Sequence, residues 1–91
     1  MKAVLVTTEF RGVFSGYATA ADMKNLPAEI TLKNARNCIY WASSVGGFAG
    51  LAAKGPNKDC KIGTQVSEIT LYKITSVTPV SDGAAKAWAD A

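Results

Sequence analysis

The segment Asn37–Ala42, with the sequence NCIYWA, is apolar on both of the faces that a β-strand would present. Because side chains alternate along a strand, Cys38 and Tyr40 would share one face and Ile39 and Trp41 the other. A strand that is apolar on both faces needs cover on both sides, as a central strand or a strand beneath another element has. The segment belongs to the longer stretch Asn34–Gly63, around which the chain is expected to be organised.

Four other segments have the β-branched or alternating pattern of strands. They are Lys2–Thr8, Val13–Ala18, Glu29–Lys33 and the long segment Glu68–Val80. The turn-like residues Glu9–Gly12 predict a hairpin between the first two, and Gly16 in the second predicts a bulge or a close backbone approach. We expect a loop over Thr19–Pro27, a tight connection at Asn34–Arg36 and a short strand at Cys60–Ile62.

Two segments have the pattern of helices. Gly47–Lys54 places three apolar side chains on one helical face, and Gly55 and Pro56 are typical of the residues that follow a helix end. Near the end of the sequence, Ser81 is a favourable N-cap for an alanine-rich helix. Trp88 is expected to anchor that helix on the sheet, because the helix is too short to be stable alone.

These elements predict a single α+β domain over residues 1–91, built mainly from an antiparallel sheet or a small β-barrel, with a short internal helix and a C-terminal helix. A domain of this size buries only about 60–65% of the surface that its unfolded chain exposes, which limits its stability as a monomer. Charged residues make up 19% of the sequence, so much of the surface is uncharged. A homo-oligomer is therefore expected.

Several classes of function lack the residues that they need. The sequence contains no histidine, which excludes Ser-His and Cys-His nucleophile pairs and an imidazole base. Two cysteines without a CxxC pair do not form the usual zinc ligand set, and no glycine-rich nucleotide fingerprint follows a strand. We expect no enzyme activity, no metal and no cofactor. The apolar run Ala3–Val6 is too short for a signal peptide or a membrane span, so a cytoplasmic protein without membrane contact is expected.

The residues that favour ligand binding gather around the apolar strand. The net charge of +3 favours small anions more than a nucleic acid. A guanidinium and aromatic faces suit a planar, anionic, nucleotide-like ligand, by hydrogen bonds to phosphate and by stacking on a base. The candidate ligand-binding residues are Arg11, Arg36, Asn37, Tyr40, Trp41, Lys54 and Lys58, with Lys61 in the same loop. The alternatives are that Tyr40 and Trp41 are core residues and that Arg11 is an exposed turn charge.

Motifs along the chain are EFRGVF at Glu9–Phe14, LKNARNCIYW at Leu32–Trp41, CKIG at Cys60–Gly63 and the closing pair Ala87–Trp88. Together they resemble a family of short uncharacterised proteins of tailed phages. The resemblance covers nearly the whole chain and implies a phage origin and the cytoplasm of an infected host. It transfers no function to individual residues.

These observations lead to one hypothesis and two alternatives. A small phage protein without catalytic groups would bind a nucleotide-like anion at a pocket between subunits, and by analogy would sequester a host immune signal as an anti-defence sponge. A resemblance to the Sm-like small barrel, carried by RGVFSGY, DMKNL and ITLKNA, would instead make the chain an RNA-binding module. The third alternative is a protein-interaction or virion accessory module that uses the apolar face of Asn37–Ala42.

Overall fold

The fold was analysed in a computed structural model that describes residues 1–19 and 29–91. The strands of this part of the chain are β1 (Lys2–Thr8), β2 (Gly12–Ala18), β3 (Glu29–Tyr40), β4 (Lys61–Ile62), β5 (Val66–Tyr72) and β6 (Ile74–Pro79). The helices are α2 (Gly47–Ala53) and α3 (Asp82–Asp90), with short 3-10 helices η1 (Glu9–Arg11) and η2 (Ser43–Val45). The loop predicted over Thr19–Pro27 lies, apart from Thr19, outside the described residues.

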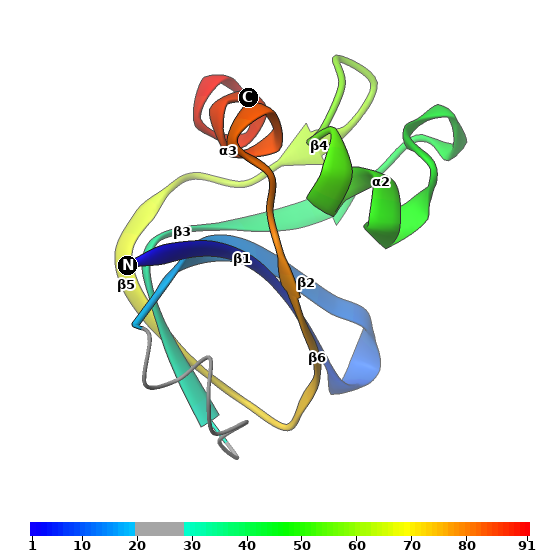
Figure 1. Cartoon of the computed structure of the whole chain (residues 1–91). Helices are drawn as coiled ribbons and strands as arrows, with labels where there is room; N and C mark the ends of the chain where they lie inside the picture. Colours follow the sequence, from blue (N-terminus) through cyan, green and yellow to red (C-terminus); the bar gives the residue numbers. More distant parts are fainter. Residues whose placement is uncertain (20–28) are drawn as a thin grey trace.

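The strands form one sheet that curls strongly and is antiparallel at every pairing of the described residues (Figure 1). Its order is β4-β3-β2-β1-β6, and β5 also pairs with β3. The predicted hairpin of β1 and β2 is confirmed, in register from Lys2 opposite Ala18 to Thr8 opposite Gly12. Among the described strands no pairing joins β5 to β6, so the sheet is open there. The small α+β domain is confirmed, and of its two predicted forms it is the open sheet rather than the closed barrel.

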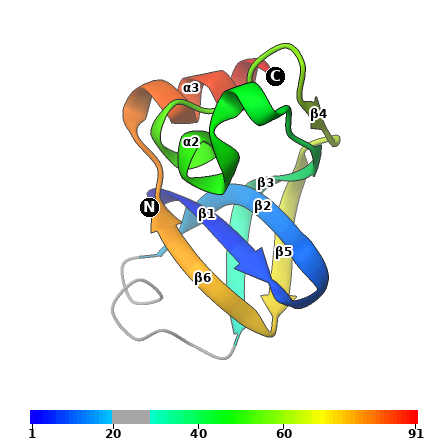
Figure 2. The same ribbon diagram turned by 90° about the vertical axis from the view of Figure 1, so that its right-hand side faces the viewer.

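The two faces of the sheet carry separate hydrophobic cores. The inner core lies inside the curl and contains Val4, Val6, Ala18, Ile30, Leu32, Ala35 and Leu71. The outer core lies between the sheet and the helices and contains Leu5, Val13, Cys38, Val45, Leu51, Ala52 and Trp88. Leu5 follows Val4 in the sequence but faces the other core, as the two-residue period of a strand requires. Helices α2 and α3 therefore cover one end of the sheet on its outer face (Figure 2).

Strand β3 is continuous where the sequence predicts two strands. The tight connection predicted at Asn34–Arg36 is wrong, because the strand runs through these residues with Asn34 at a φ of +50°. Asparagine tolerates this left-handed conformation better than most residues. The register between β2 and β3 also shifts at Gly16. A Cβ atom on Gly16 would lie 2.8 Å from the Cβ atom of Leu32, so the predicted irregularity and close approach at this glycine are confirmed.

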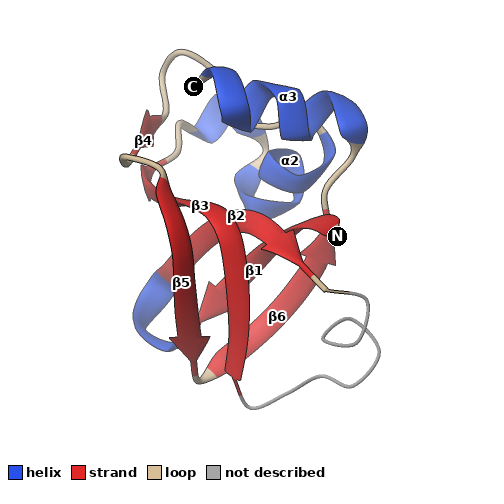
Figure 3. Cartoon of the chain, turned by 90° about the vertical axis from the view of Figure 1, so that its left-hand side faces the viewer, coloured by secondary structure: helices blue, strands red, loops and turns tan. Residues whose placement is uncertain are grey.

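The single long strand predicted at Glu68–Val80 is also wrong. The segment forms two strands, β5 and β6, which meet at Lys73 and then diverge (Figure 3). Lys73 has a φ of +55°, which is not an extended conformation, so the chain turns there. Glu9 holds this turn from the neighbouring hairpin, because its N–H donates to the Lys73 carbonyl at 3.0 Å and its carboxylate lies 3.6 Å from the Lys73 ammonium.

Helix α3 docks through the two residues that the sequence indicates. The Ser81 hydroxyl accepts a hydrogen bond from the Ala84 N–H at 3.1 Å and donates one to the Ala53 carbonyl at 2.8 Å. It therefore caps α3 and ties its start to the end of α2. Trp88 is 4% exposed and donates from Nε1 to the Leu51 carbonyl at 3.1 Å, which confirms its role as the anchor. None of the helices in residues 1–19 and 29–91 has the length and the apolar character needed to cross a membrane.

Candidate functional site

Arg36 of β3 lies at the C-terminal end of α3, where main-chain oxygens hold its guanidinium. Its Nε donates to the Gly63 carbonyl at 2.9 Å, and its Nη1 donates to the main-chain oxygens of Trp88 at 3.0 Å and Ala91 at 2.5 Å. The last carbonyls of a helix have no partner within the helix, and a cation there also meets the negative end of the helix dipole. The guanidinium thus joins α3 to β3 and to the segment between β4 and β5.

The residues that follow Arg36 divide between surface and core. Ile39 is 60% exposed and Tyr40 is 59% exposed, so the cover predicted for both faces of this strand is wrong for these two side chains. Trp41 is half-buried and packs against the outer core. The Asn37 side chain is exposed, while its carbonyl accepts a hydrogen bond from the Gly63 N–H at 2.7 Å. Tyr40 is therefore the aromatic residue of this group with a largely free ring.

Three exposed lysines, Lys54, Lys58 and Lys61, lie between the end of α2 and β4. Within the described part of the chain, the lysines in ion pairs are Lys33 with Glu68, Lys73 with Glu9, and Lys86 with Asp90. The lysines between α2 and β4 thus have no acidic partner among these residues. Their charge is available to an anion.

Tyr40 of β3 pairs with Lys61 of β4, at a point where the register between the two strands shifts. Lys61 and Lys58 line a broad surface depression of about 730 Å³, a volume that includes open solvent. Its other lining residues are Asn57, Cys60, Ile62, Asp90 and Ala91. Tyr40, Lys58 and Lys61 together form what is called the basic surface below. Its depression adjoins the Arg36 contact through Ala91.

Two further residues predicted from the sequence are Lys54 and Arg11, which belong to other segments of the chain. Lys54 follows α2, and its N–H donates to the Gly50 carbonyl at 2.8 Å while its side chain is exposed. Arg11 ends η1 in the turn between β1 and β2, and its side chain lies outside the described part of the chain.

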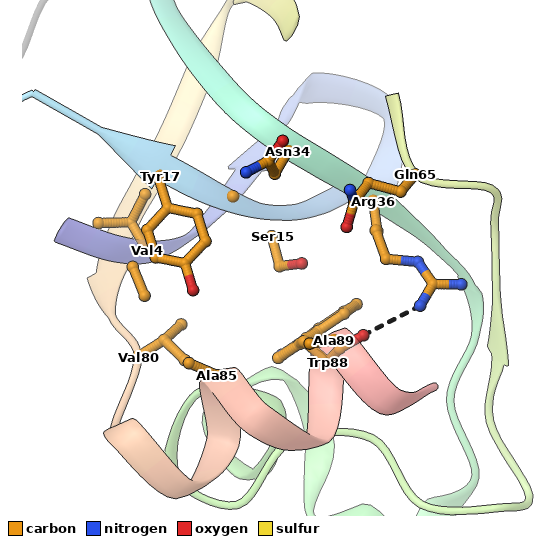
Figure 4. A pocket seen from close by; sticks show the side chains of 12 residues that line it. Val4, Ser15, Tyr17, Asn34, Arg36, Gln65, Val80, Ala85, Trp88 and Ala89 are labelled. Carbon is orange, nitrogen blue, oxygen red and sulfur yellow. Dashed lines mark hydrogen bonds between the residues drawn. The ribbon is translucent and has the colours of Figure 1, made fainter. Parts of the chain in front are cut away.

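A second concave site lies between α3 and the outer face of β2 and β3 (Figure 4). This site, the α3 pocket, has a volume of about 360 Å³, part of which is open solvent. Its lining combines polar residues, namely Ser15, Tyr17, Asn34, Arg36 and Gln65, with apolar ones, namely Ala3, Val4, Gly16, Val80, Ala85, Trp88 and Ala89. The alternation of Ser15 and Tyr17 along β2 places both on one face, but a pocket exists there only because α3 docks across it.

The two cysteines lie near each other at the outer core. Burial and the neighbouring Cys60 raise the pKa of the Cys38 thiol from 9.0 to about 11. Because the thiolate is the reactive form, Cys38 is inert near neutral pH. Cys60 is partly exposed and donates a weak hydrogen bond from Sγ to the Asn57 side-chain oxygen at 3.4 Å.

Comparison with known proteins gives a family and no activity. No curated protein and no solved structure matches the chain. The model of one family, described as a domain of unknown function (DUF6948), matches residues 1–88, which is nearly the whole sequence. The chain therefore belongs to the family of the domain of unknown function DUF6948.

Proposed function

We propose that this protein is a non-catalytic binding protein for a small anionic, nucleotide-like ligand, and that the basic surface receives the ligand. The observation that carries the proposal is the pairing of Tyr40 with Lys61 across β3 and β4, with Lys58 beside the same depression. An exposed ring offers a stacking face for a base, and the two ammonium groups offer charge to a phosphate. Neither lysine has an acidic partner in the described residues that an anion would have to displace.

The position of Arg36 changes which residues carry the proposal. Its Nε and Nη1 are engaged with three main-chain oxygens, so its first role is to hold α3. Those oxygens also offset its charge, which makes it a weaker partner for phosphate than an unpaired lysine. Lys58 and Lys61 are therefore the phosphate contacts that we propose.

The biological role that we propose is sequestration. A phage protein that binds a nucleotide-derived immune signal in the host cytoplasm, without converting it, would lower the free concentration of that signal. This role rests on the resemblance of the sequence to short phage proteins and on the absence of histidine and of nucleotide fingerprints from the sequence. It needs a dissociation constant below the concentration of the signal and enough protein to match it.

Calorimetric titration with cyclic nucleotides and ADP-ribose derivatives tests the proposal. We expect at least one of them to bind, and we expect Tyr40→Ala and Lys61→Glu each to raise its dissociation constant about tenfold or more, as the loss of stacking or of a charge contact would. Tyr72→Ala and Lys2→Glu are matched controls, because Tyr72 is an equally exposed strand tyrosine and Lys2 an exposed lysine at another site. The controls should change the constant less than about twofold. A panel in which no nucleotide binds would overturn the proposal.

If no nucleotide binds, RNA is the alternative ligand. Phosphates along a strand would engage more lysines than one small ligand can, so the logarithm of the association constant would fall steeply with the logarithm of salt concentration. A short single-stranded RNA therefore belongs in the same panel. Binding of RNA with a steep salt dependence, together with no binding of any nucleotide, would favour the small-barrel alternative.

A second candidate function, a protein-interaction module, is favoured by the exposure of Ile39. Its side chain is 60% exposed, next to Tyr40, on the strand that the sequence marks as apolar on both faces. Another copy of this chain would cover it in the homo-oligomer that we also propose. Light scattering across a range of protein concentrations tests this, and Ile39→Asp should shift the protein toward the monomer while nucleotide binding at Lys61 persists. A wild-type protein that is monomeric at every concentration would exclude the homo-oligomer.

A further inference from the structure

The α3 pocket contains the nearly buried Ser15 hydroxyl, for which no described residue supplies a hydrogen-bond partner. The exposed fraction of Ser15 is 5%. Among the described residues, no fully enclosed side-chain nitrogen or oxygen lacks a partner, so the Ser15 oxygen has to reach open space. Figure 4 shows this side chain in the middle of the pocket, between β2 and α3. A hydroxyl in this position is ready to bond to a molecule that enters.

Three further polar side chains surround the same space. Tyr17, Asn34 and Gln65 also line the pocket and have no partner among the described residues. In Figure 4 the Tyr17 hydroxyl points toward Ala85 of α3, while Asn34 lies on β3 near Ser15 and Gln65 lies beside Arg36. The two amides each offer a hydrogen-bond donor and an acceptor. The hydroxyls of Ser15 and Tyr17 can each donate or accept a hydrogen bond. The pocket therefore suits a molecule that carries both donors and acceptors at its edges.

The charge of the lining favours a neutral molecule. Among the described residues no carboxylate lines the pocket, and Arg36 is the one ionised side chain of the described lining. The Nη1 atom of that guanidinium donates to the Trp88 and Ala91 main-chain oxygens, which offset its charge. The remaining wall is apolar and includes Ala3, Val80 and the buried Trp88. A group with an apolar body would pack there, and an anion would gain little.

The size of the pocket limits the molecule further. The volume of about 360 Å³ includes open solvent and the cavity itself is about 40 Å³, so the pocket would hold one edge of a small molecule rather than enclose the whole of it. Asparagine and glutamine amides pair in two-point fashion with the edges of nucleobases, and a tyrosine ring offers a face for stacking. We propose that the α3 pocket binds a neutral, planar, nucleobase-like heterocycle through Ser15, Tyr17, Asn34 and Gln65. This site is separate from the basic surface and does not depend on it.

Nuclear magnetic resonance titration of the intact protein with phosphate-free nucleosides tests the proposal. The probes are adenosine, guanosine, cytidine and uridine, with glucose as a neutral, non-planar control. We expect one or more nucleosides to shift the amide signals of Ser15, Tyr17, Asn34 and Gln65 in a saturable way, and glucose to shift none. A titration in which no nucleoside shifts these signals would overturn the proposal, as would an equal response to glucose, which would indicate a polyol site.

Variants test whether nucleosides bind at the α3 pocket rather than elsewhere on the surface. Ser15→Ala and Gln65→Ala should each weaken nucleoside binding about fivefold, the loss expected for one hydrogen bond. Ser67→Ala is the matched control, because Ser67 is exposed on β5 and lines neither site, and its effect should be within about twofold. Ala89→Trp adds a large side chain to an exposed position at the pocket and should abolish binding while the thermal midpoint is kept. Unchanged binding in both Ser15→Ala and Ala89→Trp would overturn the assignment, and Lys61→Glu should leave nucleoside binding intact.

Discussion

The Nη1 atom of Arg36 and the main-chain oxygen of Trp88 are 3.0 Å apart, so a residue of β3 closes the last turn of α3. The Trp88 side chain reaches the other way and donates to the Leu51 carbonyl of α2. Ser81 fixes the start of the same helix by its bonds to Ala84 and Ala53. A helix of nine residues, which would not persist alone, is thus held at both ends and in the middle. Both candidate sites border it.

Arg36→Ala should lower the free energy of unfolding by about 2 kcal/mol or more, because three main-chain oxygens lose a charged donor. Arg36→Lys should recover only part of the loss, since one ammonium cannot reproduce the two-sided geometry of a guanidinium. Urea unfolding measures the loss, and faster amide hydrogen exchange in Ala87–Ala91 would localise it to α3. Lys33→Ala is the control, because Lys33 pairs with Glu68 at a half-exposed position and should cost less than about 1 kcal/mol. An Arg36→Ala protein as stable as the wild type would contradict the structural role.

Gly50→Ala should destabilise the protein by about 2 kcal/mol or more, because a Cβ atom there would lie 1.6 Å from the Val45 carbonyl oxygen. The helix α2 and the 3-10 helix before it would have to move apart. Gly83→Ala is the opposite test within α3, since a Cβ atom there meets nothing within 4 Å. It should stabilise the protein by as much as about 1 kcal/mol through the better helix propensity of alanine. Thermal unfolding of the two variants should therefore shift in opposite directions, and a shared direction would contradict the packing at Gly50.

Local patterns in the sequence were enough to predict most elements of this fold. The β1–β2 hairpin, the capping by Ser81 and the anchoring by Trp88 each depend on residues close together in the chain or on a strong single signal. The break at Lys73 and the continuity of β3 through Asn34 were not predictable, because a non-glycine residue with positive φ leaves no clear composition signal. In both cases the surrounding sheet, rather than the residue, decides the conformation.

The candidate sites depend on contacts between distant segments, which periodicity does not reveal. Arg36 was named from the sequence as a ligand-binding candidate, but the oxygens that it binds in the structure belong to residues 27, 52 and 55 positions away. The α3 pocket likewise exists only after the last helix docks on β2. The exposed tyrosine and lysines of the basic surface were named from the sequence, whereas the cross-strand pairing of Tyr40 with Lys61 required the register of β4.

Ser81→Ala should lower the free energy of unfolding by about 1–2 kcal/mol, because it removes the N-cap of α3 and the bond to the Ala53 carbonyl together. Ser81→Thr keeps the hydroxyl and should restore most of the loss. Ser67→Ala, at an exposed position of β5, is the matched control and should stay within about 0.5 kcal/mol of the wild type. Chemical denaturation read by tryptophan fluorescence suits the comparison, since Trp88 lies in α3. Equal effects of the two alanine variants would show that Ser81 does not cap the helix.

The raised pKa of Cys38 predicts a loss of stability at alkaline pH. The folded protein holds the thiol proton up to a pKa of about 11, whereas the unfolded chain releases it near 9.0. The stabilisation from this group is therefore complete below pH 9 and declines as the pH rises through 11, where the folded thiol also ionises. Lysines and tyrosines titrate in the same range, so the measurement is the difference in unfolding free energy between the wild type and Cys38→Val at pH 8, 9, 10 and 11. We expect the difference to shift in favour of the variant from pH 9 upward, whereas the control Ser67→Ala, which leaves both cysteines in place, should keep a constant difference from the wild type. A difference that stays constant across this pH range would mean that burial does not raise the pKa of Cys38.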